Sequence, residues 1–261
     1  IPPVTGGVRF SVTAATFDAA LGNVLFAVAT NEARQALTGV FMHFDGLNDQ
    51  LILAATDSYR LAEKSIPLRE RVEGERKTIV PSRALAELRR ILSVLRDNAE
   101  APEVLEIELT ENQIVFRYGT VELLSRTVEG VYPDYRQIIP RSSSTEILLS
   151  KVAFAQAIKR TSLFSKAGLF DVKLEVNPEE KTVTLSAADV GRGENTVSIE
   201  GEITGIPNAA VLNFRYLLDG VNAMASDRVV LRLIDAMNPC VVTPENRPED
   251  KYLYIVMPIR Q

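Results

Sequence analysis

An α+β fold built from two copies of one domain is predicted for this 261-residue chain by three features of its sequence. Two stretches of the chain carry the same order of strand and helix signals. The helical segments are apolar on one face only, and short polar turns join successive strands, which requires antiparallel neighbours. Helices packed on one face of antiparallel sheets define the α+β class.

The first copy opens with a strand at residues 10–12 and an amphipathic helix. Apolar residues of this helix recur at i, i+4, i+7, i+8 and i+11, a spacing typical of one buried helical face: Phe17, Leu21, Val24, Leu25 and Val28. Strands at 39–44 and 50–57 flank a polar turn at 45–49, as in a hairpin.

The second copy repeats this order with a strand at 147–149, a helix, and strands at 171–176 and 181–189. Phe17 matches Phe154 at an offset of 137 residues, and residues 80–85 match 212–217 at an offset of 132. Solenoid repeats are only about 20–50 residues long, so this period indicates two copies of a whole domain. We place the domains at residues 1–142 and 143–261.

A second helix in each copy follows the later strands and carries basic residues on its outward face. The helix that begins at Pro81-Ser82 has an apolar stripe and four arginines, of which Arg83 and Arg90 lie opposite the stripe and Arg89 and Arg96 on its flanks. The stripe consists of Leu85, Leu88, Leu92 and Leu95. In the second copy, Arg215 lies opposite a stripe of Leu217, Val221 and Met224, and the neighbouring helix carries Lys159 and Arg160.

These basic faces have two interpretations. The chain has 29 basic and 34 acidic residues and a net charge of −5, so a protein coated in basic residues is excluded, but a single basic face is not. Glu87 and Asp219 also point outward. A solvated face of mixed charge is therefore the more common explanation of this pattern taken alone.

Catalytic patterns are lacking in the sequence. A nucleophilic triad built on Asp57 and Ser58 would need the lone histidine, His43, for which we expect a structural role at the surface or half-buried. The lone cysteine, Cys240, excludes an internal disulfide and a multi-cysteine zinc site, and we expect it to be buried. No dinucleotide or phosphate-loop motif occurs, so we expect no enzyme activity, no bound metal and no cofactor.

The cellular location is predicted from the same composition. No apolar run approaches the length of about 18 residues that spans a membrane, and the chain lacks the basic start of a signal peptide. We expect a reduced, cytoplasmic protein.

Three segments together resemble the bacterial DNA polymerase III beta subunit family, the DNA sliding clamps. They are Ala-Ala-Thr-Asp-Ser-Tyr-Arg-Leu-Ala at 54–62, Val-Tyr-Pro-Asp-Tyr-Arg-Gln-Ile-Ile-Pro at 131–140 and Tyr-Ile-Val-Met-Pro-Ile-Arg-Gln at 254–261. The resemblance covers essentially the whole chain and implies the DNA clamp fold. Because the family has three domains, it also implies a fragment that opens at the linker with Pro2-Pro3 and lacks the first domain.

The resemblance implies two functional surfaces and a location at the bacterial nucleoid. The first surface faces double-stranded DNA, without sequence preference, inside a ring that closes as a head-to-tail homodimer when the first domain is present. Its residues would be Arg34, in the loop before the strand at 39–44, and Arg83, Arg90, Lys159, Arg160 and Arg215.

The second surface implied by the resemblance is a hydrophobic cleft that docks short linear motifs of polymerase subunits, the clamp loader and repair factors. Its walls would be Leu37, Thr56, Ser58, Tyr59, Arg60, Leu61, Pro133, Gln137 and Ile138 on one side. On the other side would be Leu169, Asn213, Tyr216, Met237, Pro239, Ile255, Val256, Met257, Pro258, Ile259 and Arg260.

The leading hypothesis is a non-catalytic processivity factor for DNA replication. The alternative is a truncated clamp that acts only as a peptide-binding module without ring closure. A hydrolase or transferase built on Asp57, Ser58 and His43 is the third and weakest hypothesis.

Overall fold

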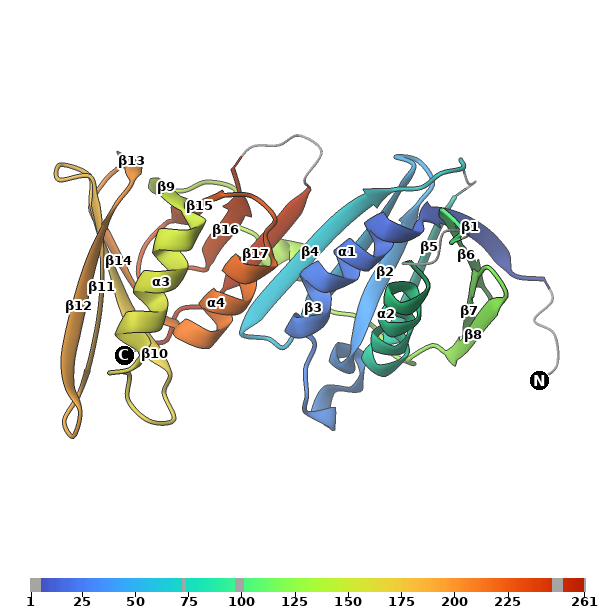
Figure 1. Cartoon of the computed structure of the whole chain (residues 1–261), viewed down its shortest axis with the longest axis horizontal. Helices are drawn as coiled ribbons and strands as arrows, with labels where there is room; N and C mark the ends of the chain where they lie inside the picture. The colour runs from blue at the N-terminus through green and yellow to red at the C-terminus, as the bar shows by residue number, and fades with distance from the viewer. Residues whose placement is uncertain (1–5, 72–73, 97–100, 246–250, 261) are drawn as a thin grey trace. The chain divides into compact units, whose positions relative to one another are not determined.

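The chain forms two compact units, which are described separately (Figure 1). A computed structural model describes residues 6–71, 74–96, 101–245 and 251–260. Unit 1 holds residues 1–58 and 62–133, and unit 2 holds residues 59–61 and 134–261. Unit 2 thus begins at Asp134, whereas the repeat places the domain boundary after residue 142; that boundary stays a prediction.

Unit 1 has the element order strand, helix, four strands, helix, three strands. Its elements are β1 (Val8–Thr13), α1 (Ala14–Val24), the 3-10 turns η1 (Leu25–Ala27) and η2 (Glu32–Thr38), β2 (Gly39–Asp45), β3 (Gln50–Thr56), β4 (Arg60–Pro67), β5 (Glu75–Pro81), α2 (Ser82–Arg96), β6 (Val104–Leu109), β7 (Gln113–Tyr118) and β8 (Val121–Arg126). Of these, the first two residues of β4, together with Tyr59, group with unit 2.

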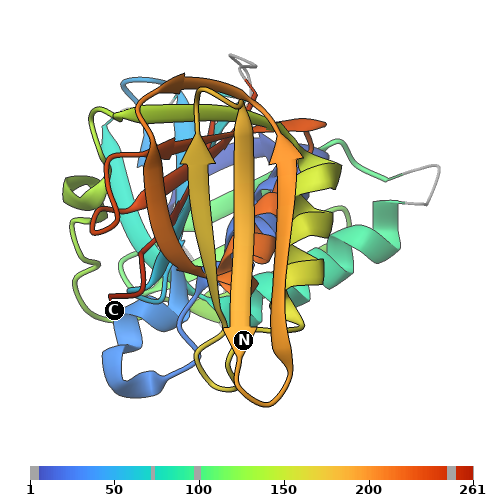
Figure 2. The same ribbon diagram turned by 90° about the vertical axis from the view of Figure 1, so that its left-hand side faces the viewer.

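Unit 2 repeats this order after a short 3-10 turn, with one additional strand, β13, between its two helices. Its elements are η3 (Tyr135–Ile138), β9 (Thr145–Ser150), α3 (Lys151–Ser162), β10 (Asp171–Asn177), β11 (Thr182–Asp189), β12 (Gly193–Glu200), β13 (Glu202–Gly205), β14 (Asn208–Asn213), α4 (Phe214–Ala223), β15 (Arg228–Leu233), β16 (Cys240–Pro244) and β17 (Tyr252–Val256). Figure 2 looks onto the sheet that contains β10 to β12, with α3 beside it.

The sheets confirm the internal repeat strand by strand. The order β1-β6-β7-β8 in unit 1 corresponds to β9-β15-β16-β17 in unit 2, and β4-β3-β2-β5 corresponds to β12-β11-β10-β14. Even the register is shared, because Gly39 pairs with Pro81 and Asp171 pairs with Asn213, at the predicted offset of 132 residues. The paired strands are antiparallel, as the short turns require.

The helices pack in pairs, α1 against α2 and α3 against α4, and each pair also contacts the strands of its own unit. The predicted stripe of α2 is confirmed at Leu85, Leu88 and Leu92, which are buried, while Leu95 is half-buried. Helix α1 ends at Val24, earlier than its apolar pattern predicts, because Leu25 turns into a 3-10 helix that buries Ala27. In the described part of the chain, no helix is both long and apolar enough to cross a membrane.

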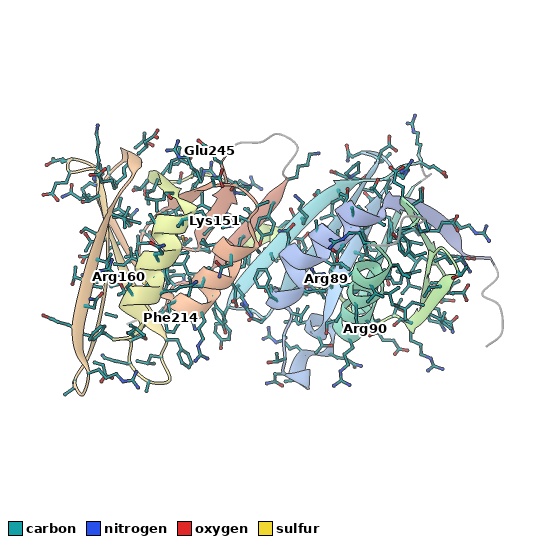
Figure 3. The ribbon with its side chains drawn as sticks, viewed as in Figure 1. Arg89, Arg90, Lys151, Arg160, Phe214 and Glu245 are labelled. Carbon is teal, nitrogen blue, oxygen red and sulfur yellow. The ribbon has the colours of Figure 1, made fainter. Side chains whose placement is uncertain are left out.

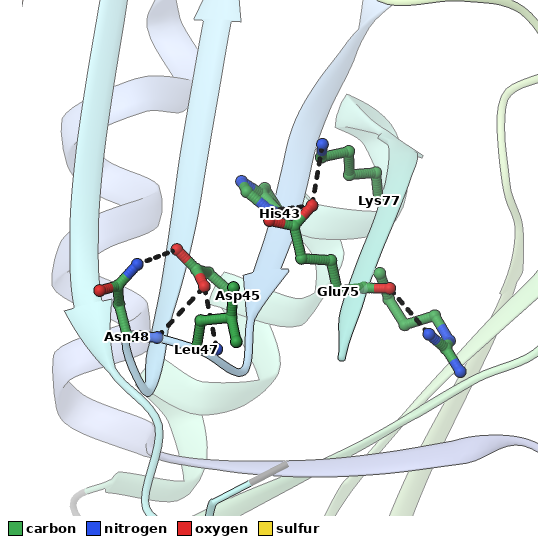
Figure 4. A network of polar contacts seen from close by, with 7 residues as sticks. His43, Asp45, Leu47, Asn48, Glu75 and Lys77 are labelled. Atoms are coloured by element: carbon green, nitrogen blue, oxygen red, sulfur yellow. Dashed lines mark hydrogen bonds and ion pairs between the residues drawn. The ribbon is translucent and has the colours of Figure 1, made fainter. Parts of the chain in front are cut away.

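His43 corrects one expectation: its side chain is buried rather than half-buried or at the surface. Strand β2 lies between β3 and β5, and its second face is covered as well, since the ring of Phe41 stacks on that of Tyr132 at 5.0 Å. The cover that Tyr132 gives to Phe41, on the same face as His43, leaves no signal in the alternation of β2 itself, because Tyr132 follows β8 by several residues. The His43 Nε2 atom lies 3.5 Å from Oε2 of Glu75, which also pairs with Lys77 (Figure 4).

Candidate functional site

Of the four arginines of α2, one has no ion-pair partner among the described residues and two are paired with carboxylates. Arg83 is exposed and has no side-chain partner among the described residues. Arg90 donates to both carboxylate oxygens of Glu87, a hydrogen bond that lowers the pKa of Glu87. Arg89, labelled with Arg90 in Figure 3, pairs with Asp18 of α1 at 2.9 Å. Of the three, Arg83 presents the least compensated positive charge.

Unit 2 presents its cations on both helices. Lys159 and Arg160 are exposed in the last turn of α3 and have no side-chain partner among the described residues. Arg215, at the position of α4 equivalent to Arg83 in α2, stacks its guanidinium 3.6 Å from the centroid of the Phe170 ring. The stack fixes the direction of Arg215 without neutralising its charge.

Basic residues also lie where helix stability disfavours them. None of the four helices has an acidic residue in its first turn, while Arg83, Lys151 and Arg215 lie in the first turns of α2, α3 and α4. A cation at this end opposes the helix dipole at a cost of about 0.3–1 kcal/mol. Helix N-termini and nearby cations together attract anions such as phosphate. Helix stability therefore does not account for the placement of these residues.

Arg34 lies in η2, at a residue whose backbone is not helical. Its Nη1 donates to Oγ of Ser58 at 3.2 Å. Ser58 occupies the tight turn after β3 with a positive φ of 81°, and its amide donates to Oγ1 of Thr56 at 3.1 Å. Asp57 lies in the same turn, one residue beyond the end of β3, whereas the sequence predicts it as the last residue of that strand.

Tyr59 and Arg60 meet the C-terminal run within unit 2. The Met257 amide donates to the Tyr59 carbonyl at 2.9 Å, as one strand does to its neighbour. The guanidinium of Arg60 lies 4.5 Å from the centroid of the Tyr216 ring and pairs with Asp219. Arg60 is thereby held on the surface of α4, and Asp219, which sequence reasoning treats only as an outward charge, is its ion-pair partner.

Helix α4 is held in place by its cap and by β17. Oδ1 of Asn213 accepts from the amides of Arg215 and Tyr216, at 2.9 and 3.4 Å, which caps the helix. The Tyr254 hydroxyl donates to the Tyr216 carbonyl at 2.7 Å. Further along, the Ile259 amide donates to the Val211 carbonyl at 2.8 Å, so the C-terminal run follows the end of β14.

Exposed apolar side chains occur in unit 2 among the residues predicted for the cleft. Tyr59 is 64% exposed, Met237 55%, Leu169 52% and Ile138 42%. The Met237 amide donates to Oδ1 of Asp235, which fixes the turn that presents Met237 and lowers the pKa of Asp235. Exposed apolar groups mark a surface that contacts a partner only where they form one contiguous patch.

The other predicted cleft residues differ in accessibility. Exposed are Ser58, Pro133, Gln137 and Arg260; partly exposed are Arg60, Asn213, Tyr216, Pro239, Met257, Pro258 and Ile259. Leu37, Thr56, Leu61, Ile255 and Val256 are buried. The five buried residues offer no exposed surface to a ligand. The sequence does not distinguish them from the exposed residues of the set, because alternation alone does not show which face of a strand is covered. The assignment of the whole set to a cleft stays a prediction.

The predicted burial of Cys240 is confirmed, and this burial raises the pKa of its thiol to about 12. Among the described residues, no group of three or more histidine, cysteine or acidic side chains is placed to hold a metal ion. The contact of Phe170 with Arg215 was not predicted from the sequence. Its signal, an aromatic just before a strand, is too common to identify a partner for Arg215.

Comparison with known proteins assigns both units to one family. Residues 11–134 match the model of the DNA polymerase III beta subunit, central domain, and residues 136–260 match that of its C-terminal domain. The chain is 32% identical to the beta sliding clamp of Synechocystis sp. over its full length, which covers 67% of that protein. It is 31% identical to the beta sliding clamps of Caulobacter vibrioides and Staphylococcus aureus, of which it covers 61% and 59%.

Solved structures agree with the fold. The DNA polymerase sliding clamp from Bacillus subtilis superposes with a TM-score of 0.91 at 27% identity, covering 100% of this chain and 66% of that one. The DNA polymerase III subunit beta from Pseudomonas aeruginosa, at 23% identity, has a TM-score of 0.90 and supports the fold alone. The predicted α+β clamp fold is therefore confirmed. The chain belongs to the DNA polymerase III beta subunit family of DNA replication, the beta sliding clamps, which are non-catalytic subunits of the polymerase.

Proposed function

We propose that this chain is part of a processivity factor that encircles duplex DNA and docks polymerases and repair factors through a hydrophobic peptide-binding cleft. The observation that carries the DNA role is the placement of exposed cations at equivalent helix positions, Arg83 and Arg215, in a chain whose net charge is −5. Lys159 and Arg160 extend the positive face of unit 2.

The DNA contact in this proposal is electrostatic. Cations near the phosphates release condensed counterions, which gives affinity without sequence preference and lets the protein slide. Arg83, Lys159, Arg160 and Arg215 are the strongest candidates, because no described carboxylate neutralises them. Arg90 contributes less, since Glu87 offsets its charge, and Arg34 stays a candidate through its exposed position beside Ser58.

The peptide contact rests on the C-terminal run and the start of α4. Tyr59, Leu169 and Met237 expose apolar surface, while Arg60 and Tyr216 form a fixed polar and aromatic element beside Met257. Such a surface suits an extended peptide with hydrophobic side chains, and methionine adapts to different partners.

Peptide docking is tested by the fluorescence anisotropy of a labelled Gln- and Leu/Phe-rich peptide titrated with the chain. The double variant Leu169→Ala, Met257→Ala is expected to raise Kd at least tenfold, about 1.4 kcal/mol. Leu163→Ala, an exposed leucine at the end of α3, is the matched control and should change Kd less than twofold. Equal binding by the double variant and the control would exclude this surface.

The DNA contact is tested separately by the salt dependence of duplex binding. Arg83→Gln together with Arg215→Gln should reduce the slope of log K against log salt by about 2, roughly one for each phosphate that is no longer neutralised. Arg126→Gln, which removes an exposed arginine from β8, should leave the slope unchanged. An unchanged slope in the double variant contradicts the DNA role.

The alternative, a peptide-binding module without ring closure, is distinguished from the encircling clamp by measuring how long the protein stays on nicked circular DNA. An encircling protein stays on the circle and leaves after linearisation. Peptide binding with equally fast release from both DNA forms would favour the module.

A further inference from the structure

A pocket in unit 2 is lined by none of the residues assigned above to DNA or peptide binding, although Ile138 and Ile255 neighbour its lining in sequence and in register. It encloses about 330 Å³, which is near the lower end for small-molecule sites. The segment before β9 forms one wall, and β15, β16 and β17 form the floor. The lining consists of Ile139, Pro140, Arg141, Ser142, Ser143, Arg232, Ile234, Val241, Thr243 and Leu253.

Arg232 is held in the floor by its neighbours. Its Nε donates to Oε2 of Glu146 at 2.7 Å, and Glu146 lies directly opposite it in the β9–β15 register. Its Nη1 donates to Oγ1 of Thr243 at 3.0 Å. The remaining nitrogen, Nη2, takes part in neither bond, and 30% of the side chain is exposed. An arginine fixed by two bonds loses little further side-chain entropy when it binds an anion.

The wall formed by the segment before β9 adds a second cation. Arg141 is exposed and has no side-chain partner among the described residues, and the hydroxyl groups of Ser142 and Ser143 follow it directly. None of the ten lining residues is acidic. Two arginines and two serines therefore line one pocket. Glu146 offsets the charge of Arg232, so Arg141 supplies the uncompensated positive charge.

Apolar groups complete the lining. Ile139 and Pro140 belong to the wall, and Ile234, Val241 and Leu253 to the floor. A bare inorganic anion would use the guanidinium groups and leave this apolar surface without a partner. An anion attached to a hydrocarbon group would use both parts of the pocket.

We propose that this pocket binds a small organic anion, a carboxylate or phosphate group carried on a short apolar body. Arg232 and Arg141 bind the charged group, and Ile139, Val241 and Leu253 contact the apolar body. This inference is independent of the proposed clamp function, because it uses none of the same residues.

The experiment is an amide-resolved NMR titration of the 261-residue chain with three probes. 4-Phenylbutyrate carries a carboxylate, phenyl phosphate carries a phosphate, and 4-phenylbutanamide is the neutral match of the first. We expect saturable shifts at residues 139–143 and 232–243 with at least one anionic probe, and a Kd at least tenfold weaker for the amide. The tighter of the two anions identifies the charged group.

Three variants connect the binding to the pocket. Arg141→Gln removes an exposed side chain without a described partner, so the fold is preserved, and it should weaken the tighter anion at least fivefold. Arg232→Lys keeps the positive charge but removes the planar guanidinium group, and should also weaken binding of the tighter anion. Arg126→Gln, which removes one exposed positive charge from β8 of unit 1, is the control and should have no effect.

The proposal is overturned if neither anion gives saturable shifts, if the amide binds as tightly as phenylbutyrate, or if Arg141→Gln binds like the control. Arg232 would then be only a cross-strand partner of Glu146.

Discussion

Replacing Gly220 with alanine tests whether the packing of α4 on β17 is as close as the structure indicates. A Cβ atom at position 220 would lie 2.1 Å from Cδ1 and Cε1 of the Tyr254 ring. Carbon atoms prefer to be about 3.5–4.0 Å apart, so one group must move. The ring has little freedom to do so, because Tyr254 is fully buried and its hydroxyl is bound to the Tyr216 carbonyl.

The size of the effect follows from two opposing contributions. Alanine in a helix interior is favoured over glycine by about 1 kcal/mol. Overpacking of a filled core costs typically about 1–3 kcal/mol, and displacement of the Tyr254 hydroxyl adds about 1 kcal/mol for a broken hydrogen bond. We expect a net destabilisation of about 2 kcal/mol, which lowers the Tm of a domain of this size by roughly 5–10 °C.

The assay is urea unfolding followed by circular dichroism, with calorimetry to separate the two units, since a two-domain chain need not unfold in one step. A glycine of unit 1 supplies the control. Gly22 also lies near the end of a helix, α1, but its added Cβ would meet only the flexible end of the Arg89 side chain, 3.3 Å away. Gly22→Ala should therefore be neutral or stabilising.

A Gly220→Ala protein that is as stable as the wild type would refute the packing argument. A Gly22→Ala protein destabilised by the same amount would show that glycine is needed for another reason. Because α4 carries Arg215 and Tyr216, the first variant should also weaken peptide binding if the proposed surface is correct.

Three further predictions concern single side chains. Glu108 is buried, and its pKa is lowered below the ordinary value of 4.5, chiefly by its hydrogen bond to Arg117. The stability that this ion pair contributes is present above about pH 4.5 and is lost as the pH falls through the lowered pKa. The stability difference between wild type and Glu108→Gln should therefore shrink in acid, and a pH-independent difference would contradict the ion pair. Asn213→Ala removes the cap of α4 and should cost about 1 kcal/mol in urea unfolding, with Asn213→Asp as the conservative control that retains stability. Cys240, whose thiol pKa is raised to about 12 by burial, should react with a maleimide at about pH 8 only after unfolding, and rapid labelling of the folded chain would contradict its burial.

The fold is predictable from the sequence because its signals are periodic and occur twice. The apolar faces of α2 and α4 follow helical spacing, and the antiparallel hairpins follow from short polar turns. His43 shows where such reasoning fails, since the face of β2 that it shares with Phe41 is covered in part by Tyr132, which is far away in the chain. A residue on the second face of a strand carries no sign of what covers it.

The exposed positions of the cations were predictable from the sequence, and their side-chain partners less so. Arg83 and Arg215 are identified by their place opposite an apolar stripe. The compensation of Arg90 by Glu87 follows from their spacing of three residues, but the stacking of Arg215 on Phe170 depends on a turn between α3 and β10. Contacts of this kind are set by loop geometry, which hydrophobic patterning does not encode.

The change of repeat offset from 137 to 132 has a consequence for how the two copies have diverged. Between the first helix and the next strand, unit 1 has five residues more than unit 2, yet the sheets on either side keep the same register. The additional length forms η1 and η2, where the Ala29 amide closes the loop by donating to the Leu37 carbonyl. Lengthening a loop costs only tenths of a kcal/mol in closure entropy, whereas one residue inserted into a strand would turn its buried face outward. The two copies thus differ in length at the place where the sheets are insensitive to it, and the longer segment is the one that carries Arg34.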